Sequence, residues 1–140
     1  MVTECLFQTL IKQDPLQRSG VEIVAEHWQN HGLTMKGLRM EDGSGLARAD
    51  FIRPIDLARV LWLARRGPHG DVYSNTLNRY HDDRVRWKGG AMSRVRAYTG
   101  FVQSDSGKEL TFAFMINNYE ASTDAIATWR GRLVEFMLER

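Results

Sequence analysis

A basic, glycine-containing segment at residues 84–92, Arg-Val-Arg-Trp-Lys-Gly-Gly-Ala-Met, has the residue types needed to hold a peptide at the edge of a sheet. Its lysine, Lys88, supplies a positive charge for a carboxylate. Its second glycine, Gly90, lets the backbone of a strand lie close to a bound chain. A lone lysine on a strand is more often a solvated surface residue, so Lys88 depends on its neighbours for this interpretation.

A second segment, Asp-Gly-Ser-Gly-Leu-Ala-Arg at residues 42–48, could be read as a nucleophile turn or a phosphate-binding loop. Ser44 has no neighbouring base in the sequence, and the pattern of a phosphate-binding P-loop is absent. These residues therefore favour a structural turn, with no catalytic role for Ser44.

Other candidate residues point to packing or solvation. The four histidines, His27, His31, His69 and His81, are spread over the chain, and we predict no metal site and no cofactor. The run His81-Asp82-Asp83 reads as a solvated turn before a strand. The four tryptophans fall mostly on apolar stripes, which favours core packing over ligand stacking. For Trp87 the choice between these two roles is the least certain of the four.

Three blocks in order along the chain, residues 42–48, 84–92 and 98–102, resemble the D-alanyl-D-alanine carboxypeptidase/endopeptidase group of penicillin-binding proteins. The resemblance implies that Lys88-Gly89-Gly90-Ala91 occupies the place of a Lys-Thr-Gly-[Ser/Thr] strand that binds substrate. Lys88 and Gly90 match that pattern, whereas Gly89 and Ala91 lack the hydroxyls that donate to the substrate carboxylate. Lys88, Gly89, Gly90, Ala91 and Met92 are the implied substrate-binding residues.

The resemblance also implies an acyl-serine mechanism, but this sequence contains no complete catalytic set. Enzymes of this kind need S-x-x-K and S-x-N or S-D-N segments. No serine here has a lysine three residues later or an asparagine two residues later, as shown by Ser19, Ser44, Ser74, Ser93, Ser104, Ser106 and Ser122. We therefore expect the C-terminal fragment of a peptidoglycan D-Ala-D-Ala carboxypeptidase or endopeptidase, inactive by itself.

Composition narrows the class of protein. The 140 residues carry 19 Lys and Arg against 17 Asp and Glu, a net charge of +2 that does not favour nucleic-acid binding, even through the arginines of residues 84–96. The single Cys5 excludes an internal disulfide and favours a buried thiol.

There is no signal peptide pattern and no apolar stretch of bilayer length. The resemblance places the full-length parent in the periplasm or cell envelope, with peptidoglycan stem peptides or β-lactams as its partners.

The elements that position these residues follow from periodicity. An apolar stripe of Val2, Cys5, Leu6, Thr9 and Leu10 predicts a helix over residues 1–12, and Ser19 and Glu22 predict a capping box for a second helix that ends at His31-Gly32. Pro54 begins a third helix that ends at Gly67-Pro68, and a weaker helical stretch covers residues 72–80.

A period of two from Arg84 onward predicts strands at residues 84–92, 95–101 and 110–116. Ser122 or Thr123 then caps a helix with Ile126, Trp129, Leu133, Phe136 and Met137 on its apolar face. The fold class is α+β, a single domain over residues 1–140 that forms the C-terminal portion of a β-lactamase/transpeptidase-like fold.

Surface charge and sheet edges leave alternatives open. Arg84 and Arg86 share the Lys88 face of a regular strand, and Arg94 and Arg96 could extend this positive surface or simply solvate an exposed strand. In the resembled family, the outer strands of a five-stranded sheet come from the N-terminal part of the chain, so one edge would be open here. A non-catalytic peptide-binding or assembly module, including a homo-oligomer, is the alternative function.

Overall fold

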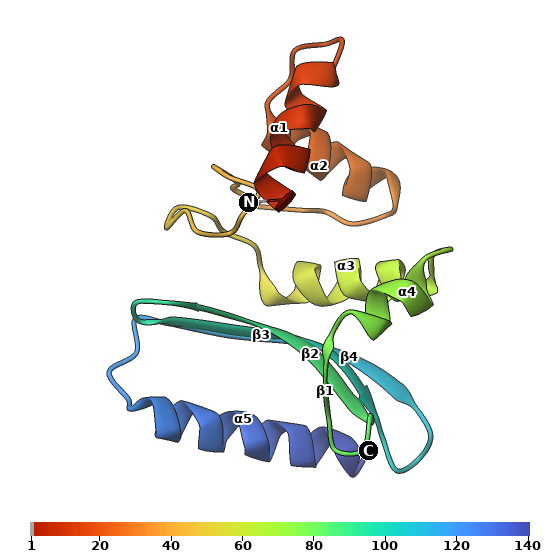
Figure 1. Cartoon of the computed structure of the whole chain (residues 1–140), viewed down its shortest axis with the longest axis vertical. Coiled ribbons are helices and arrows are strands. Elements are labelled where there is room, and N and C mark those ends of the chain that lie inside the picture. Colours follow the sequence, from red (N-terminus) through yellow and green to blue (C-terminus); the bar gives the residue numbers. More distant parts are fainter. Residues whose placement is uncertain (1) are drawn as a thin grey trace. The chain divides into compact units, whose positions relative to one another are not determined.

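The computed structural model describes residues 2–140, and their contacts divide into two compact units. Unit 1 comprises residues 1–56 and unit 2 comprises residues 57–140. Figure 1 shows their elements in chain order. The two units are described separately below.

Unit 1 begins with two helices, α1 (Val2–Gln13) and α2 (Gly20–Asn30). The capping box predicted at the start of α2 is confirmed, because the Ser19 side chain accepts from the Glu22 backbone N–H and the Glu22 carboxylate accepts from Ser19. The residue that α1 buries is Phe7, which is 6% exposed.

The helix predicted over residues 1–12 is confirmed in its described part as α1, but the apolar stripe is not its buried side, because Val2, Leu6 and Leu10 are exposed and Phe7 faces the interior instead. The prediction of a buried thiol is also wrong, since Cys5 lies on the exposed side of the same helix. Gly20 and Gly43 both lie against the Phe7 ring, so the packing partners of this ring decide which side of α1 is inside. Helical periodicity shows which residues share one side of a helix, but it does not show which other segment packs against that side.

Unit 1 ends in a loop region and the first turn of α3 (Pro54–Arg66). One antiparallel bridge joins Arg39 to Phe51. Arg53 then holds the buried Asp56 carboxylate through its Nε at 2.6 Å and its Nη2 at 2.9 Å, and the same Nη2 donates to Thr34. The hydrogen bonds that Arg53 donates to Asp56 raise the pKa of Arg53. This pair attaches the start of α3 to the preceding loop.

Unit 2 contains a four-stranded antiparallel sheet, β1 (Asn78–Tyr80), β2 (Val85–Met92), β3 (Val95–Gln103) and β4 (Glu109–Asn117), in the order β1-β2-β3-β4. The three strands predicted after Arg84 are confirmed as a meander. The helix predicted over residues 72–80 is wrong in its second half: α4 (Gly70–Asn75) is helical, and β1 pairs with β2. That pairing closes a hairpin through the turn at residues 81–84, and pairing between strands is not visible in the helical periodicity of one segment.

Helices cover both faces of this sheet (Figure 1). On one face, α5 (Thr123–Leu138) begins at the predicted N-cap Ser122 and buries Val134 and Leu138. These two residues pack in a core with Val85, Trp87, Val102 and Phe112. On the other face, Phe101 packs with Leu61 of α3 and with Leu77. The predicted α+β class is therefore confirmed.

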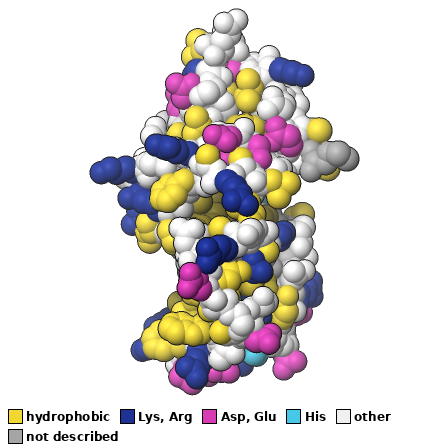
Figure 2. Space-filling model, turned by 90° about the vertical axis from the view of Figure 1, so that its left-hand side faces the viewer, with side chains coloured by type: hydrophobic (Ala, Val, Ile, Leu, Met, Phe, Trp, Pro, Cys, Tyr) yellow, Lys and Arg dark blue, Asp and Glu magenta, His cyan; other side chains and the backbone are white. Residues whose placement is uncertain are grey.

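The apolar face predicted for α5 is partly wrong. Ile126 is buried, but Trp129 is 66% exposed and Phe136 is 51% exposed. Trp62 of α3 is also exposed, so core packing holds for Trp87 alone among the tryptophans of unit 2. Figure 2 shows hydrophobic side chains at the surface among Lys and Arg side chains. The helix turns Val134 and Leu138 toward the sheet, which leaves the neighbouring stripe outside.

Gly131 lies inside α5, where a side chain has room, so we expect Gly131→Ala to stabilise unit 2 by roughly 0.5–1 kcal/mol. A Cβ at this position would meet no atom within 4 Å, and alanine loses less backbone entropy than glycine when a helix forms. Urea unfolding monitored by circular dichroism measures the effect. A lower midpoint than that of the wild-type chain would contradict it.

Candidate functional site

The candidate binding segment, Lys88–Met92, occupies the second half of β2. Strand β3 pairs with the whole of β2, from Val85 opposite Val102 to Met92 opposite Val95. On the other side, β1 pairs only with Val85, Arg86 and Trp87. Within residues 2–140, therefore, no strand covers the outer side of Lys88–Met92. We call this stretch the open β2 edge.

Hydrogen-bond register determines which backbone groups face the open β2 edge. The Gln103 N–H donates to the Arg84 carbonyl at 2.7 Å, which makes these two residues a hydrogen-bonded pair. In an antiparallel ladder such pairs recur at every second residue, so Lys88 and Gly90 bond to β3. The N–H and C=O groups of Gly89 and Ala91 then point outward. A peptide backbone could pair with them as an additional strand.

The two glycines of this edge have different surroundings. A Cβ on Gly90 would lie 4.0 Å from the Cβ of Ala97, so nothing in the sheet requires glycine there. A Cβ on Gly89 would lie 3.3 Å from the Tyr98 ring, which packs directly against this glycine. The Tyr98 ring therefore takes up space beside the Gly89 backbone, on the face of the sheet that α5 covers.

Lys88 is exposed and lies on the opposite face, as does Arg86 two residues before it. Its Nζ donates to the Gly89 carbonyl at 2.5 Å. None of the carboxylates in the described residues forms an ion pair with it. Its positive charge is thus available beside the open β2 edge. Met92, the last of the predicted binding residues, is half-buried at the turn into β3.

The arginines near Lys88 do not form one continuous surface. Arg86 donates to Ser74 at 3.2 Å and to Asn75 at 2.8 Å, and Arg84 pairs with Asp105. Arg96 lies opposite Ala91, which places it on the α5 face and away from Lys88, so the predicted extension of the positive surface is wrong.

Arg94 does not contribute to that surface either. It lies in the turn between β2 and β3 and pairs with Glu120 at 3.2 Å. The alternation of residues along each strand was correct, but the register between strands decides which faces coincide.

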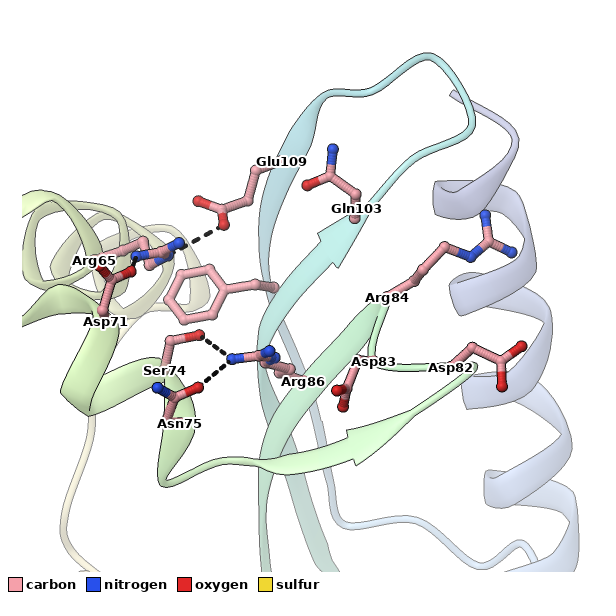
Figure 3. Close-up of a pocket in the computed structure, with 11 residues that line it drawn as sticks. Arg65, Asp71, Ser74, Asn75, Asp82, Asp83, Arg84, Arg86, Gln103 and Glu109 are labelled. Atoms are coloured by element: carbon pink, nitrogen blue, oxygen red, sulfur yellow. Dashed lines mark hydrogen bonds and ion pairs between the residues drawn. The ribbon is translucent and has the colours of Figure 1, made fainter.

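A polar cleft of about 560 Å³ lies beside the first half of β2 on the Lys88 face (Figure 3). Arg65 points toward Asp71 and Glu109 and pairs with both, at 2.6 and 3.1 Å, and these contacts raise its pKa. Arg86 reaches into the cleft toward Ser74, which is 4% exposed. The lining residues are Arg65, Asp71, Ser74, Asn75, Asp82, Asp83, Arg84, Arg86, Phe101, Gln103 and Glu109.

Sequence reasoning did not find this cleft. Its walls come from α3, α4, the turn before β2 and the ends of three strands, which are distant in the chain. The polar residues of α4, Ser74 and Asn75, carry no motif that would have marked them. Arg65 pairs with two carboxylates and Arg84 pairs with Asp105, whereas Arg86 is the lining arginine that bonds only to neutral side chains.

The segment 42–48 is a turn held by one carboxylate. Asp42 accepts from the backbone N–H groups of Ser44 at 2.9 Å, Gly45 at 2.6 Å and Ala47 at 2.9 Å. Burial by itself would raise the pKa of Asp42, but the hydrogen bonds from Gly45, Ser44 and Ala47 outweigh burial and keep this pKa low. These bonds support the predicted structural turn.

The carboxylates of unit 1 predict sensitivity to acid. Hydrogen bonds from Arg18 lower the pKa of Asp14, and hydrogen bonds from Ser19 lower the pKa of Glu22. The pKa of Asp42 is also low, because of the hydrogen bonds in its turn. Their contribution to stability is present above the ordinary values of 3.8 and 4.5 and is lost as pH falls below them. We expect Asp42→Asn to reduce the difference in unfolding free energy between pH 7 and pH 3.

Urea titrations followed by amide NMR signals of residues 2–56 measure this difference. Asp82→Asn is the control, because Asp82 is exposed and makes no described hydrogen bond. An equal effect of the two substitutions on the pH dependence would contradict the assignment to the Asp42 turn.

His27 and His31 are four residues apart in the sequence, on and just after α2, and the structure places their ring centroids 4.7 Å apart. His31 Nδ1 is 2.8 Å from the His27 carbonyl oxygen. Within residues 2–140, no group of three His, Cys, Asp or Glu side chains is placed to hold a metal ion. Nor does any described helix have the length and apolar character needed to cross a membrane.

Comparison with known proteins gives one family and one fold. The family model for D-Ala-D-Ala carboxypeptidase 3 (S13) matches residues 1–139. The crystal structure of penicillin binding protein 4 (dacB) from Haemophilus influenzae in complex with a β-lactam has a TM-score of 0.75 and 20% identity, over 98% of this chain and 36% of that chain. No curated protein matches.

A second crystal structure of the same H. influenzae protein has a TM-score of 0.74 and 21% identity, over 98% of this chain and 35% of that one. The likeness at this level of identity is one of fold. The chain spans about a third of the length of the protein whose fold it shares.

Proposed function

We propose, because this chain belongs to the D-Ala-D-Ala carboxypeptidase 3 (S13) family, that its open β2 edge binds peptidoglycan peptides ending in D-Ala-D-Ala. Residues 1–140 are then one part of a penicillin-binding domain of the cell envelope or periplasm. The domain hydrolyses the terminal D-Ala-D-Ala bond, or a peptide cross-link, through an acyl-serine intermediate.

One observation carries this proposal. The backbone groups of Gly89 and Ala91 face outward where β1 has ended, and Lys88, which makes no described ion pair and donates to the Gly89 carbonyl, lies beside them. An extended peptide can add to this edge through main-chain hydrogen bonds, and Lys88 can attract its terminal carboxylate. The resemblance to the penicillin-binding enzymes implies that this stretch of the strand corresponds to their Lys-Thr-Gly motif.

In this proposal the 140 residues contribute peptide binding and not bond cleavage. No serine here is followed by a lysine three residues later, so the proposal assigns no nucleophile to these residues. We expect the 140-residue chain to bind peptide without hydrolysing it. In the assembled site, Lys88 and the edge groups of Gly89 and Ala91 orient the peptide toward the serine.

A titration with an acetylated tripeptide ending in D-Ala-D-Ala tests the proposal. We expect the largest amide NMR shifts at Gly89, Gly90 and Ala91, with no hydrolysis product. The same tripeptide with a C-terminal amide, which lacks the carboxylate, should bind more weakly. Shifts confined to unit 1, or equal binding of acid and amide, would remove the proposed role of Lys88. Fluorescent penicillin should leave the 140-residue chain unlabelled.

The absence of hydroxyls at Gly89 and Ala91 leads to a separate prediction. Ala91→Ser restores one hydroxyl of the Lys-Thr-Gly-[Ser/Thr] pattern at an exposed position, and we expect about fivefold tighter binding of the tripeptide, the effect of one net hydrogen bond. Ala97→Ser adds a hydroxyl on the neighbouring strand, away from the edge, and should leave affinity unchanged. Isothermal titration calorimetry measures both. Equal gains would show that hydroxyl position is irrelevant.

An assembly module is the second candidate. Within the described residues, the outer side of β4 also has no neighbouring strand, so two sheet edges could pair with a second copy. Analytical ultracentrifugation across a concentration series decides this. A stable dimer that excludes the tripeptide from the open β2 edge would favour assembly over substrate binding.

A further inference from the structure

Arg130 of α5 lies against two aromatic rings of the sheet. Its guanidinium carbon is 4.9 Å from the centroid of the Trp87 ring and 4.8 Å from that of the Tyr98 ring. The two ring centroids are themselves 5.9 Å apart. One cation thus contacts two rings that belong to neighbouring strands, β2 and β3.

The polar contacts of Arg130 do not explain its position. Its Nε is buried and has no hydrogen-bond partner among the described residues. It makes no described ion pair. Arg130 is half-buried, and the electron-rich faces of Trp87 and Tyr98 compensate the part of its guanidinium that has left water. The contacts with the two rings therefore keep the Arg130 side chain in place, and the same contacts restrict the movement of the Trp87 and Tyr98 rings.

The same two rings adjoin the open β2 edge. Trp87 immediately precedes Lys88, and its side chain is 6% exposed. Tyr98 stands directly opposite Gly89, and its ring lies 3.3 Å from the position that a Cβ on Gly89 would take. An aromatic side chain packed across a glycine compensates for the contacts that glycine lacks. The chain of contacts therefore runs from Arg130 through Tyr98 to the Gly89 backbone.

We propose that Arg130 is a positioning residue for the open β2 edge: it clamps Trp87 and Tyr98 and so fixes the backbone of Lys88 and Gly89 in a shape ready to pair with a peptide. This inference rests on the proposed function. A strand that is already ordered loses less conformational entropy when it binds, so the clamp raises affinity without touching the ligand.

Two substitutions of Arg130 test the clamp in the full 140-residue chain. Arg130→Met keeps most of the side chain's length and removes its charge, whereas Arg130→Lys keeps a charge that can still lie over the rings. Arg132→Met is the matched control, because Arg132 is an exposed arginine of the same helix with no described contact. The probes are amide hydrogen exchange and affinity for the acetylated tripeptide.

We expect Arg130→Met to lower the protection of the Lys88 and Gly90 amides, which bond to β3, about tenfold. Protection at Leu110, which pairs with Val102 on the far side of β3, should not change. Tripeptide affinity should fall about fivefold in Arg130→Met and recover at least in part in Arg130→Lys. Arg132→Met should behave as the wild-type chain.

Several outcomes overturn the inference. Unchanged protection at Lys88 and Gly90 in Arg130→Met would do so, and so would an equal loss at Leu110, which indicates general destabilisation. Normal tripeptide affinity in Arg130→Met overturns it while the proposed function stands. If the wild-type chain does not bind the tripeptide, the proposed function fails, and the exchange data alone decide whether Arg130 orders the strand.

Discussion

Replacing Gly100 with alanine is expected to disrupt the sheet of unit 2 more than any other single methyl group added to it. A Cβ at this position would lie 1.9 Å from the Arg86 carbonyl oxygen and 2.7 Å from the Trp87 Cα. Both atoms belong to the backbone of β2, which is paired on its two sides at this point. The strands cannot separate here without breaking their hydrogen bonds.

We therefore expect Gly100→Ala to destabilise the chain by about 3 kcal/mol, at the upper end of the usual cost of overpacking. Such a loss is a large fraction of the total stability of a small domain. Urea unfolding followed by Trp fluorescence measures it, and NMR signals of Lys88–Met92 should broaden or move because β2 loses its register with β3.

Gly90→Ala is the matched control for this experiment. It adds the same methyl group to the adjacent strand, where the nearest atom would be the Ala97 Cβ at 4.0 Å. We expect little change in stability. Similar losses in the two variants would mean that glycine is needed in these strands for reasons other than the contact of Gly100 with β2.

Removing the Lys88 charge is expected to give the largest loss of substrate binding. Lys88→Ala should weaken binding of the acetylated D-Ala-D-Ala tripeptide about tenfold or more, because a hydrogen bond to a charged group contributes more than a neutral one. Since Lys88 is exposed and its only described contact is with the Gly89 carbonyl, the fold should not suffer. Calorimetric titration measures the affinity, and thermal unfolding measures the stability.

Lys108→Ala provides the comparison for charge alone. Lys108 is an exposed lysine in the turn between β3 and β4, so its loss changes the net charge equally and leaves the open β2 edge intact. Lys108→Ala should bind the tripeptide as tightly as the wild-type chain does. Raising the salt concentration should weaken tripeptide binding more in Lys108→Ala than in Lys88→Ala. If both variants bind alike, the peptide does not depend on Lys88.

Local signals were sufficient for the helix starts and for the meander. The capping residues Ser19 and Ser122 and the first-turn Pro54 act on their own helices, so sequence alone located these starts. The alternation after Arg84 and the turn at residues 104–107 likewise identify adjacent antiparallel strands. These features need only contacts between near neighbours.

The sequence by itself determined the family blocks, the strand that carries Lys88 and the turn at Asp42, because each is a short run of residue types with a local physical meaning. Only the tertiary structure decided that β1 stops at Trp87, that Arg96 faces away from Lys88 and that Arg130 lies over Trp87 and Tyr98. These facts depend on strand register and on packing between distant segments, and a one-residue shift in register would reverse every face.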